Sequence, residues 1–232
     1  MLTGKQFVAK VVADNQALFK ASQHNVRAYF ESKPAKEELV EHFIGRMVNE
    51  RMNMVEISQT IANLPADADP VELQLLTQQA HDEAVHFRLV KEVIEHIQGA
   101  PVNVEKAIAA EQAKPTAKGA GLLAKYGAET DPVALAAYQL VAEGRAEAVW
   151  DEMSRCIEDE FVSGAYAKIA KDEGFHAKIG ARKLAQLAED PAVQARVEQL
   201  VQNMRKDLYD ISCRNTTPAA EGKKLVAEAY GW

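Results

Sequence analysis

Apolar residues recur every three to four positions along most of the chain, which is the spacing of one face of an α-helix. The alternation of apolar and polar residues that marks a half-buried strand does not occur over any long segment. The 8 prolines fall mainly between the periodic stretches. Proline lacks an N–H and is tolerated chiefly at the first turn of a helix or between helices. The pattern therefore predicts an all-α protein.

Prolines and capping residues mark the ends of the predicted helices. The segments "PADADP" (65–70) and "TDP" (130–132) supply Asp or Thr caps before apolar runs. The Gly- and Ala-rich stretch 99–131 predicts a long crossover with one short helix. No low-complexity linker divides the chain, so residues 1–232 are expected to form a single domain. The helices are expected at 4–30, 35–63, 70–98, 132–157, 160–189, 192–212 and 219–230.

Composition and charge indicate in which cellular compartment the protein is expected. The formal net charge of -7 is spread along the chain, without the basic runs that mark a nucleic-acid or membrane surface. The first 20 residues carry Lys5 and Asp14 and no long apolar run, so a signal peptide and a membrane span are not expected. Cys156 and Cys213 are isolated from each other, which favours a reducing compartment. We therefore expect a cytoplasmic protein.

Two short motifs carry the candidate chemistry. Asp82–His86 and Asp172–His176 both read D-E-x-x-H within predicted helices. Residues three apart on a helix lie about 60° apart around its axis, so Glu83 can meet His86 on one ion, as Glu173 can meet His176. Each pair is half of a metal site. A zinc-protease motif is excluded, because His81 and His86 are five residues apart rather than four.

Dimetal centres in helix bundles combine two Glu-x-x-His helices with single glutamates from two other helices. In a hairpin that turns at Leu64–Pro70, Glu50 lies 14 residues before the turn and Glu83 lies 13 after it, so the two are level. Glu56 lies only 8 residues before the turn and is rejected as a ligand.

The second hairpin is expected to turn near residue 158, in the polar segment "IEDE". That position makes Glu143 level with Glu173, and Glu147 is a weaker candidate for the same role. The match of "VNE" (48–50) with "VAE" (141–143) makes 41–98 and 134–190 similar to an internal repeat. Without a cation, these buried carboxylates would repel one another at a cost of several kcal/mol.

Over residues 35–190 the sequence resembles the ferritin-like di-iron carboxylate proteins. The resemblance rests on Glu50, on Glu83-Ala84-Val85-His86, on Glu143 and on Glu173-Gly174-Phe175-His176. It implies a ferritin-like four-helix bundle with a long crossover and additional N- and C-terminal helices. The paired D-E-x-x-H form is similar to the oxygen-activating branch, in which Asp82 and Asp172 would each accept the free ring N–H of a metal-bound histidine.

The resemblance also implies a function and its partners. Two Fe ions, with Mn or a mixed Mn/Fe pair as alternatives, would use O2 or peroxide to oxidise a small, largely apolar organic substrate. Electrons would come from a separate reductase, because the sequence has no flavin or nicotinamide fingerprint. A ferroxidase, a manganese-catalase-like protein and a non-catalytic helical partner subunit are the alternatives, and a homodimer is left open. Val90 stands where a radical-forming relative would carry tyrosine.

Large side chains near the expected ligands are candidates for lining a substrate pocket, although such residues at helical spacing more often belong to a core. They are Met54, Phe87, Tyr138, Trp150, Tyr166 and Phe175.

Overall fold

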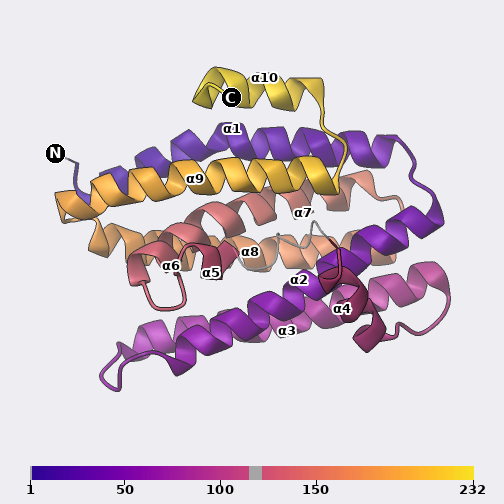
Figure 1. Ribbon diagram of the computed structural model, residues 1–232, viewed down its shortest axis with the longest axis horizontal. Coiled ribbons are helices and arrows are strands. Elements are labelled where there is room, and N and C mark those ends of the chain that lie inside the picture. Colours follow the sequence, from indigo (N-terminus) through magenta and orange to yellow (C-terminus); the bar gives the residue numbers. More distant parts are fainter. Residues whose placement is uncertain (1, 115–121) are drawn as a thin grey trace. The chain divides into compact units, whose positions relative to one another are not determined.

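The computed structural model describes residues 2–114 and 122–232, and every regular element in these residues is a helix (Figure 1). The prediction of an all-α protein is confirmed. None of the described helices combines the length and the apolar composition that a membrane span requires. The chain forms two compact units, of which unit 1 comprises residues 1–33 and 131–232 and unit 2 comprises residues 34–130. The prediction of a single domain stays a prediction.

Unit 2 is built on an antiparallel hairpin of two long helices, α2 (Lys36–Ala62) and α3 (Pro70–Gln98), which pack along each other (Figure 1). The Asp69 side chain caps α3 by accepting a hydrogen bond from the Val71 N–H, and Pro70 occupies the first turn. Gly99 ends α3 in the left-handed conformation, at φ 74°.

Two short helices, α4 (Val104–Gln112) and α5 (Leu122–Lys125), follow in unit 2. Helix α4 packs on α2. Shortly after α4, Nζ of Lys114 lies 3.1 Å from Oε1 of Glu41 and 2.7 Å from Oε2 of Glu111. The described residues of the stretch 99–131 therefore include two short helices, where one was predicted.

In unit 1, the first described helix of the chain packs against helices from the C-terminal half. Helix α1 (Gly4–Glu31) packs against α7 (Gly144–Cys156), α8 (Glu160–Leu187), α9 (Pro191–Asn215) and α10 (Ala220–Tyr230). Figure 1 shows α10 lying along α1. Phe7 and Leu18 of α1 are almost completely buried. Helix α1 is therefore part of the core of unit 1.

The predicted helix ends lie within three residues of the observed ones, because the capping residues are local signals. The exception is 132–157, which consists of α6 (Pro132–Tyr138), the π-helix η1 (Gln139–Glu143) and α7. The four-helix bundle with a core at 35–190 and added terminal helices is not confirmed. Helices α1 and α9, which were predicted to be additions to the bundle, are integral to the packing of unit 1.

Candidate metal-binding residues

In unit 2, Glu50 of α2 and two residues of α3, Glu83 and His86, gather their side chains. One potential ligand atom from each lies within 4.8 Å of the others. Nδ1 of His86 is 3.7 Å from Oε2 of Glu50 and 3.8 Å from Oε2 of Glu83. The exposed fractions are 3% for Glu50 and 0% for both Glu83 and His86. We call these residues the unit 2 triad.

Two carboxylates buried this close together need compensation from positive charge or hydrogen bonds. Asn53, on α2, donates from Nδ2 to Oε2 of Glu83 over 3.5 Å. Oε2 of Glu50 is buried and accepts no hydrogen bond from any of the described residues. Leaving a buried charged acceptor unsatisfied costs more than about 1–3 kcal/mol, so this oxygen is suited to a cation.

In unit 1, Glu143, Glu173 and His176 form a second set, which we call the unit 1 triad. Their ligand atoms also lie within 4.8 Å of one another, and the exposed fractions are 4%, 2% and 0%. Nδ1 of His176 lies 3.1 Å from Oε2 of Glu173, one turn earlier on α8. Each triad thus contains two carboxylates and one imidazole.

The π-helix η1 ends at Glu143, the only residue of the unit 1 triad that does not lie on α8. A π-helical turn inserts an extra residue into a helix and changes the direction in which the following side chains point; such turns are frequent at functional sites. Helix α8 approaches η1 closely at Gly180. A Cβ at Gly180 would lie 2.6 Å from Cβ of Gln139 and 2.7 Å from the carbonyl oxygen of Ala136. The close approach therefore requires glycine.

The two aspartates of the D-E-x-x-H motifs have polar partners on their own helices. Asp82 is buried and accepts a hydrogen bond from Nε2 of Gln78 over 2.8 Å. Asp172 is half-buried and pairs with Nζ of Lys168 over 2.5 Å. The role predicted for both aspartates, orienting a metal-bound histidine, stays a prediction.

The rival glutamates do not contribute to either triad. Burial, and then the nearby charge of Glu129, raise the pKa of Glu56 to about 7. The pKa of Glu147 is also raised, by burial, and its carboxylate occupies the space that a side chain at residue 174 would need. Gly174, between Glu173 and His176, therefore leaves room for Glu147.

The residues proposed to line a pocket differ in exposure. Rings of Trp150 and Tyr166 pack together in unit 1, with centroids 5.6 Å apart. Phe175 is 38% exposed. Tyr138, Trp150 and Tyr166 are buried, whereas Met54 and Phe87 are half-buried. Their role as a substrate pocket stays a prediction.

Two features near the triads were not anticipated from the sequence. The Asn53 hydrogen bond to Glu83 could have been suspected, because residue 53 lies about one turn after Glu50 on the same helix. The π-helix has no comparable signal, since its residues fit the ordinary helical pattern.

No protein-family model and no curated protein matches the chain. Among solved structures, the chain is similar to a TenA homolog from Pseudomonas syringae pv. tomato, with a TM-score of 0.66. The identity is 12%, and the match covers 90% of this chain and 92% of that chain. A likeness at this identity concerns the fold.

This comparison corrects the family and the function predicted from the sequence. The neighbouring fold is that of a TenA homolog, not of a ferritin-like di-iron protein. The predicted oxygen-activating di-iron oxidoreductase is therefore wrong, and the ferroxidase and manganese-catalase alternatives rested on the same family. The physical reason is that E-x-x-H spacing and level positions in a hairpin are local properties, which do not determine how the helices are connected. The chain has an all-helical fold similar to that of the TenA homolog.

Proposed function

We propose that the protein binds two divalent transition-metal ions, one at each triad, and that its function depends on them. One observation carries the proposal. Two sets of two glutamates and one histidine are buried with their ligand atoms within 4.8 Å of one another. Exposed acidic clusters are common on proteins, but buried carboxylates without compensation are costly. The burial of both triads therefore favours a cation at each.

The donor set fits such ions. Carboxylate and imidazole ligands suit Fe²⁺, Mn²⁺ and Zn²⁺, and neither triad contains a cysteine that would favour a softer ion. Two ionised glutamates and a neutral histidine balance the charge of one divalent ion. Oε2 of Glu50, which accepts no hydrogen bond from the described residues, is available as a ligand atom.

In each unit, side chains from more than one helix would bind the ion or orient its ligands. In unit 2, the amide of Asn53 donates to Oε2 of Glu83 and so helps to orient this carboxylate toward Glu50 and His86. In unit 1, the single turn between Glu173 and His176 sets two ligand atoms 3.1 Å apart, and η1 supplies Glu143 from a second helix. Three protein ligands leave coordination positions for water or a substrate.

We therefore infer that the protein is a metal-dependent enzyme. A bound divalent ion would supply Lewis acidity toward an oxygen atom of the substrate. The protein contributes a buried environment, in which the attraction between a charged ligand and the ion is stronger than in water.

Metal binding can be tested by calorimetric titration of chelator-treated protein with Mn²⁺, and with Fe²⁺ under anaerobic conditions. We expect two ions per chain. Glu50→Ala and Glu143→Ala should each reduce the number to one, and Glu56→Ala should leave it at two. Binding of one ion or none by the unaltered chain, or loss of an ion in Glu56→Ala, would contradict the proposal.

The fold likeness provides a second candidate function, an activity shared with the TenA homolog, because the match extends over 90% of the chain. This candidate does not require the triads. If the protein is active in an assay for TenA proteins, and the double variant Glu50→Ala/Glu143→Ala keeps that activity, this second function is favoured over a metal-dependent enzyme.

A further inference from the structure

The hydroxyl of Tyr230, at the end of α10, is inserted at the backbone of α1. It accepts a hydrogen bond from the N–H of Leu18 over 3.1 Å and donates one to the carbonyl oxygen of Asp14 over 2.6 Å. These are the N–H and the carbonyl that an undisturbed α-helix joins directly, four residues apart. Insertion of a polar side chain at this ladder is a recognised cause of helix bending. Tyr230 therefore acts on the backbone of α1 itself.

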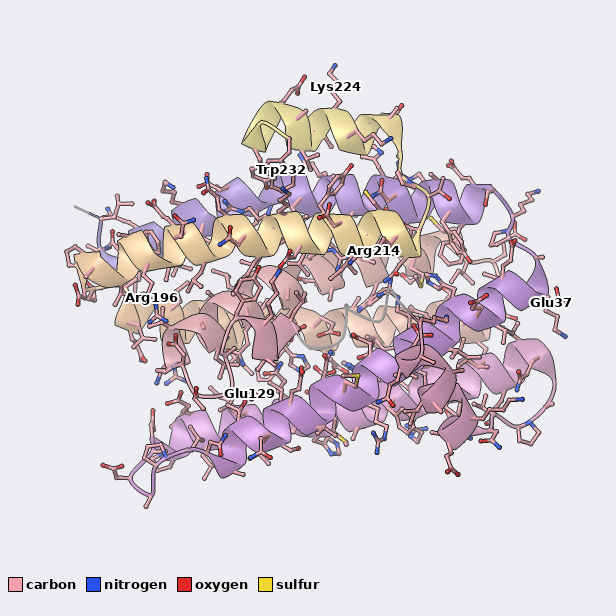
Figure 2. All side chains as sticks on the ribbon, in the orientation of Figure 1. Glu37, Glu129, Arg196, Arg214, Lys224 and Trp232 are labelled. Carbon is pink, nitrogen blue, oxygen red and sulfur yellow. The ribbon has the colours of Figure 1, made fainter. Side chains whose placement is uncertain are left out.

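Unit 1 holds the ring of Tyr230 from several sides. The guanidinium of Arg205, on α9, lies 5.4 Å from its centroid, and Nε of Arg205 donates to Oδ1 of buried Asn15 over 2.7 Å. Trp232 stacks against Tyr230, with centroids 4.8 Å apart, and lies 6.1 Å from the ring of Tyr209. Figure 2 shows Trp232 on the side of α10 that faces α1 and α9, and Lys224 pointing away from them.

The start of α10 is also fixed to α1. The N–H of Ala219 donates to Oδ1 of buried Asn25 over 2.8 Å. A Cβ at Gly222 would lie 3.0 Å from the carbonyl oxygen of Ala21, so glycine permits the close approach of the two helices. Helix α10 is thus attached to α1 at both ends through specific polar contacts.

A short path of contacts leads from this attachment to the unit 1 triad. Phe19 follows Leu18 in α1, and its Cζ lies 3.0 Å from the position of a Cβ at Gly144. Gly144 directly follows Glu143, and the same position lies 3.8 Å from Cβ of Ala177, the neighbour of His176. A change in the backbone of α1 at Leu18 is therefore expected to move a ring that packs on Gly144, the residue after Glu143.

We propose that Tyr230 is a positioning residue for Glu143, acting through the backbone of α1 and the ring of Phe19. Docked α10 holds α1 in the shape that places Phe19 against Gly144, and this contact fixes the end of η1. The inference rests on the proposed function in one respect: the effect on metal affinity requires that the unit 1 triad binds metal. The effect on the backbone around Glu143 does not.

The first test is hydrogen exchange of the metal-free, full-length protein. Tyr230→Phe keeps the ring and removes only the hydroxyl. We expect the amides of residues 141–146 to exchange roughly three- to tenfold faster, which is the effect of losing one neutral hydrogen bond. The Leu18 amide can bond directly to the carbonyl oxygen of Asp14 once the hydroxyl is gone, so it should stay protected. The core of α3 in unit 2 should be unchanged. Tyr126→Phe is the control, because the contact of its ring with Nζ of Lys125 would remain.

A second variant separates the steps of the path. Phe19→Leu should accelerate exchange at residues 141–146 while both hydrogen bonds of the Tyr230 hydroxyl to α1 remain. Unchanged exchange at residues 141–146 in both Tyr230→Phe and Phe19→Leu would overturn the inference. Equal acceleration throughout unit 1 would also overturn it, because that is the signature of general destabilisation.

The third test uses Co²⁺ as a spectroscopic probe of each triad separately. In a Glu50→Ala background, where only the unit 1 triad is intact, Tyr230→Phe should shift the Co²⁺ absorption spectrum and raise the Kd roughly three- to tenfold. In a Glu143→Ala background, with only the unit 2 triad intact, it should do neither. An unchanged spectrum and Kd in the first background would overturn the coupling to the triad. If the unaltered chain binds no Co²⁺, the proposed function fails, and hydrogen exchange still decides whether Tyr230 positions Glu143.

Discussion

Nδ1 of His176 lies 3.1 Å from Oε2 of Glu173, whereas the corresponding atoms of His86 and Glu83 are 3.8 Å apart. Both pairs are three residues apart on a helix, so the difference lies in side-chain conformation rather than in spacing. The unit 1 pair is joined by a hydrogen bond at about the separation that two ligands of one ion have, so an ion that replaces the shared proton moves these side chains little. A site that needs less rearrangement loses less free energy on binding.

We therefore expect the unit 1 triad to bind Mn²⁺ more tightly than the unit 2 triad. Titrations of Glu50→Ala, which retains the unit 1 triad, and of Glu143→Ala, which retains the unit 2 triad, measure the two affinities separately. A lower Kd for Glu143→Ala would show that the side-chain geometry of the metal-free chain does not determine the order of binding.

Neutralising Glu50 should stabilise the metal-free protein and prevent its stabilisation by metal. Glu50→Gln keeps the shape of the side chain and removes a buried charge beside Glu83, so the free energy of unfolding should rise by about 1 kcal/mol without metal. With excess Mn²⁺ the order of stability should reverse, because the unaltered protein gains stability from ligand binding. Urea unfolding with chelator and with Mn²⁺ gives both values. If Glu50→Gln is less stable in chelator, Glu50 has a structural hydrogen-bonding role instead.

The stability of unit 2 should fall as the pH rises through the titration of Glu56. Burial and Glu129 raise the pKa of this carboxyl group to about 7 in the folded protein. A raised pKa stabilises the fold below the unfolded pKa, near 4.5, and that contribution is lost as the pH rises toward and beyond 7. Because Glu56 is partly exposed, we expect the free energy of unfolding to fall by only about 1–2 kcal/mol between pH 4 and pH 8.

Glu56→Gln should remove this part of the pH dependence. The variant should therefore gain stability over the unaltered protein at pH 8 but not at pH 4, as measured by urea unfolding. Glu129→Gln should show a smaller change in the same direction, since burial contributes more than Glu129 to the shift in pKa. Parallel pH profiles for Glu56→Gln and the unaltered protein would exclude Glu56 as the titrating group.

Gly180→Ala should disrupt the contact between α8 and η1. Its Cβ would lie 2.7 Å from the backbone nitrogen of Leu140 as well as from the carbonyl oxygen of Ala136, so the backbone has to move. We expect the free energy of unfolding to fall by about 1–3 kcal/mol and metal binding at the unit 1 triad to weaken.

The same helix contains a matched control for that substitution. Gly164 has no atom within 4 Å of the position of a Cβ, so Gly164→Ala should stabilise α8 by about 0.5–1 kcal/mol through helix propensity. Thermal unfolding compares the two variants. Similar shifts in Tm would mean that the close approach at Gly180 relaxes without cost.

The sequence predicted the helices well because their ends depend on neighbouring residues. Asp69 with Pro70, and Asp190 with Pro191, cap α3 and α9 near the predicted positions. The juxtaposition of Glu50 and Glu83 also follows from counting residues on either side of one turn, since both helices are regular.

Two features depend on contacts that are distant in the sequence. The π-helix that ends at Glu143 packs against Gly180, and no pattern within 132–157 reveals that contact. The packing of α1 against α9 and α10 joins segments separated by most of the chain. A motif-based assignment treated these helices as additions, and for that reason it led to the wrong family.

The discontinuity of unit 1 has a consequence for how the protein folds during its synthesis. Helix α1 is synthesised before unit 2, yet the helices that bury Phe7 and Leu18 follow residues 34–130. Unit 2 is continuous, so the ribosome delivers all of its residues before unit 1 can close. Until then the apolar face of α1 has none of its native partners. During this interval a chaperone that binds amphipathic helices could bind α1. Pairing α1 with the last helices requires closure of a long loop, which is a slow step in folding.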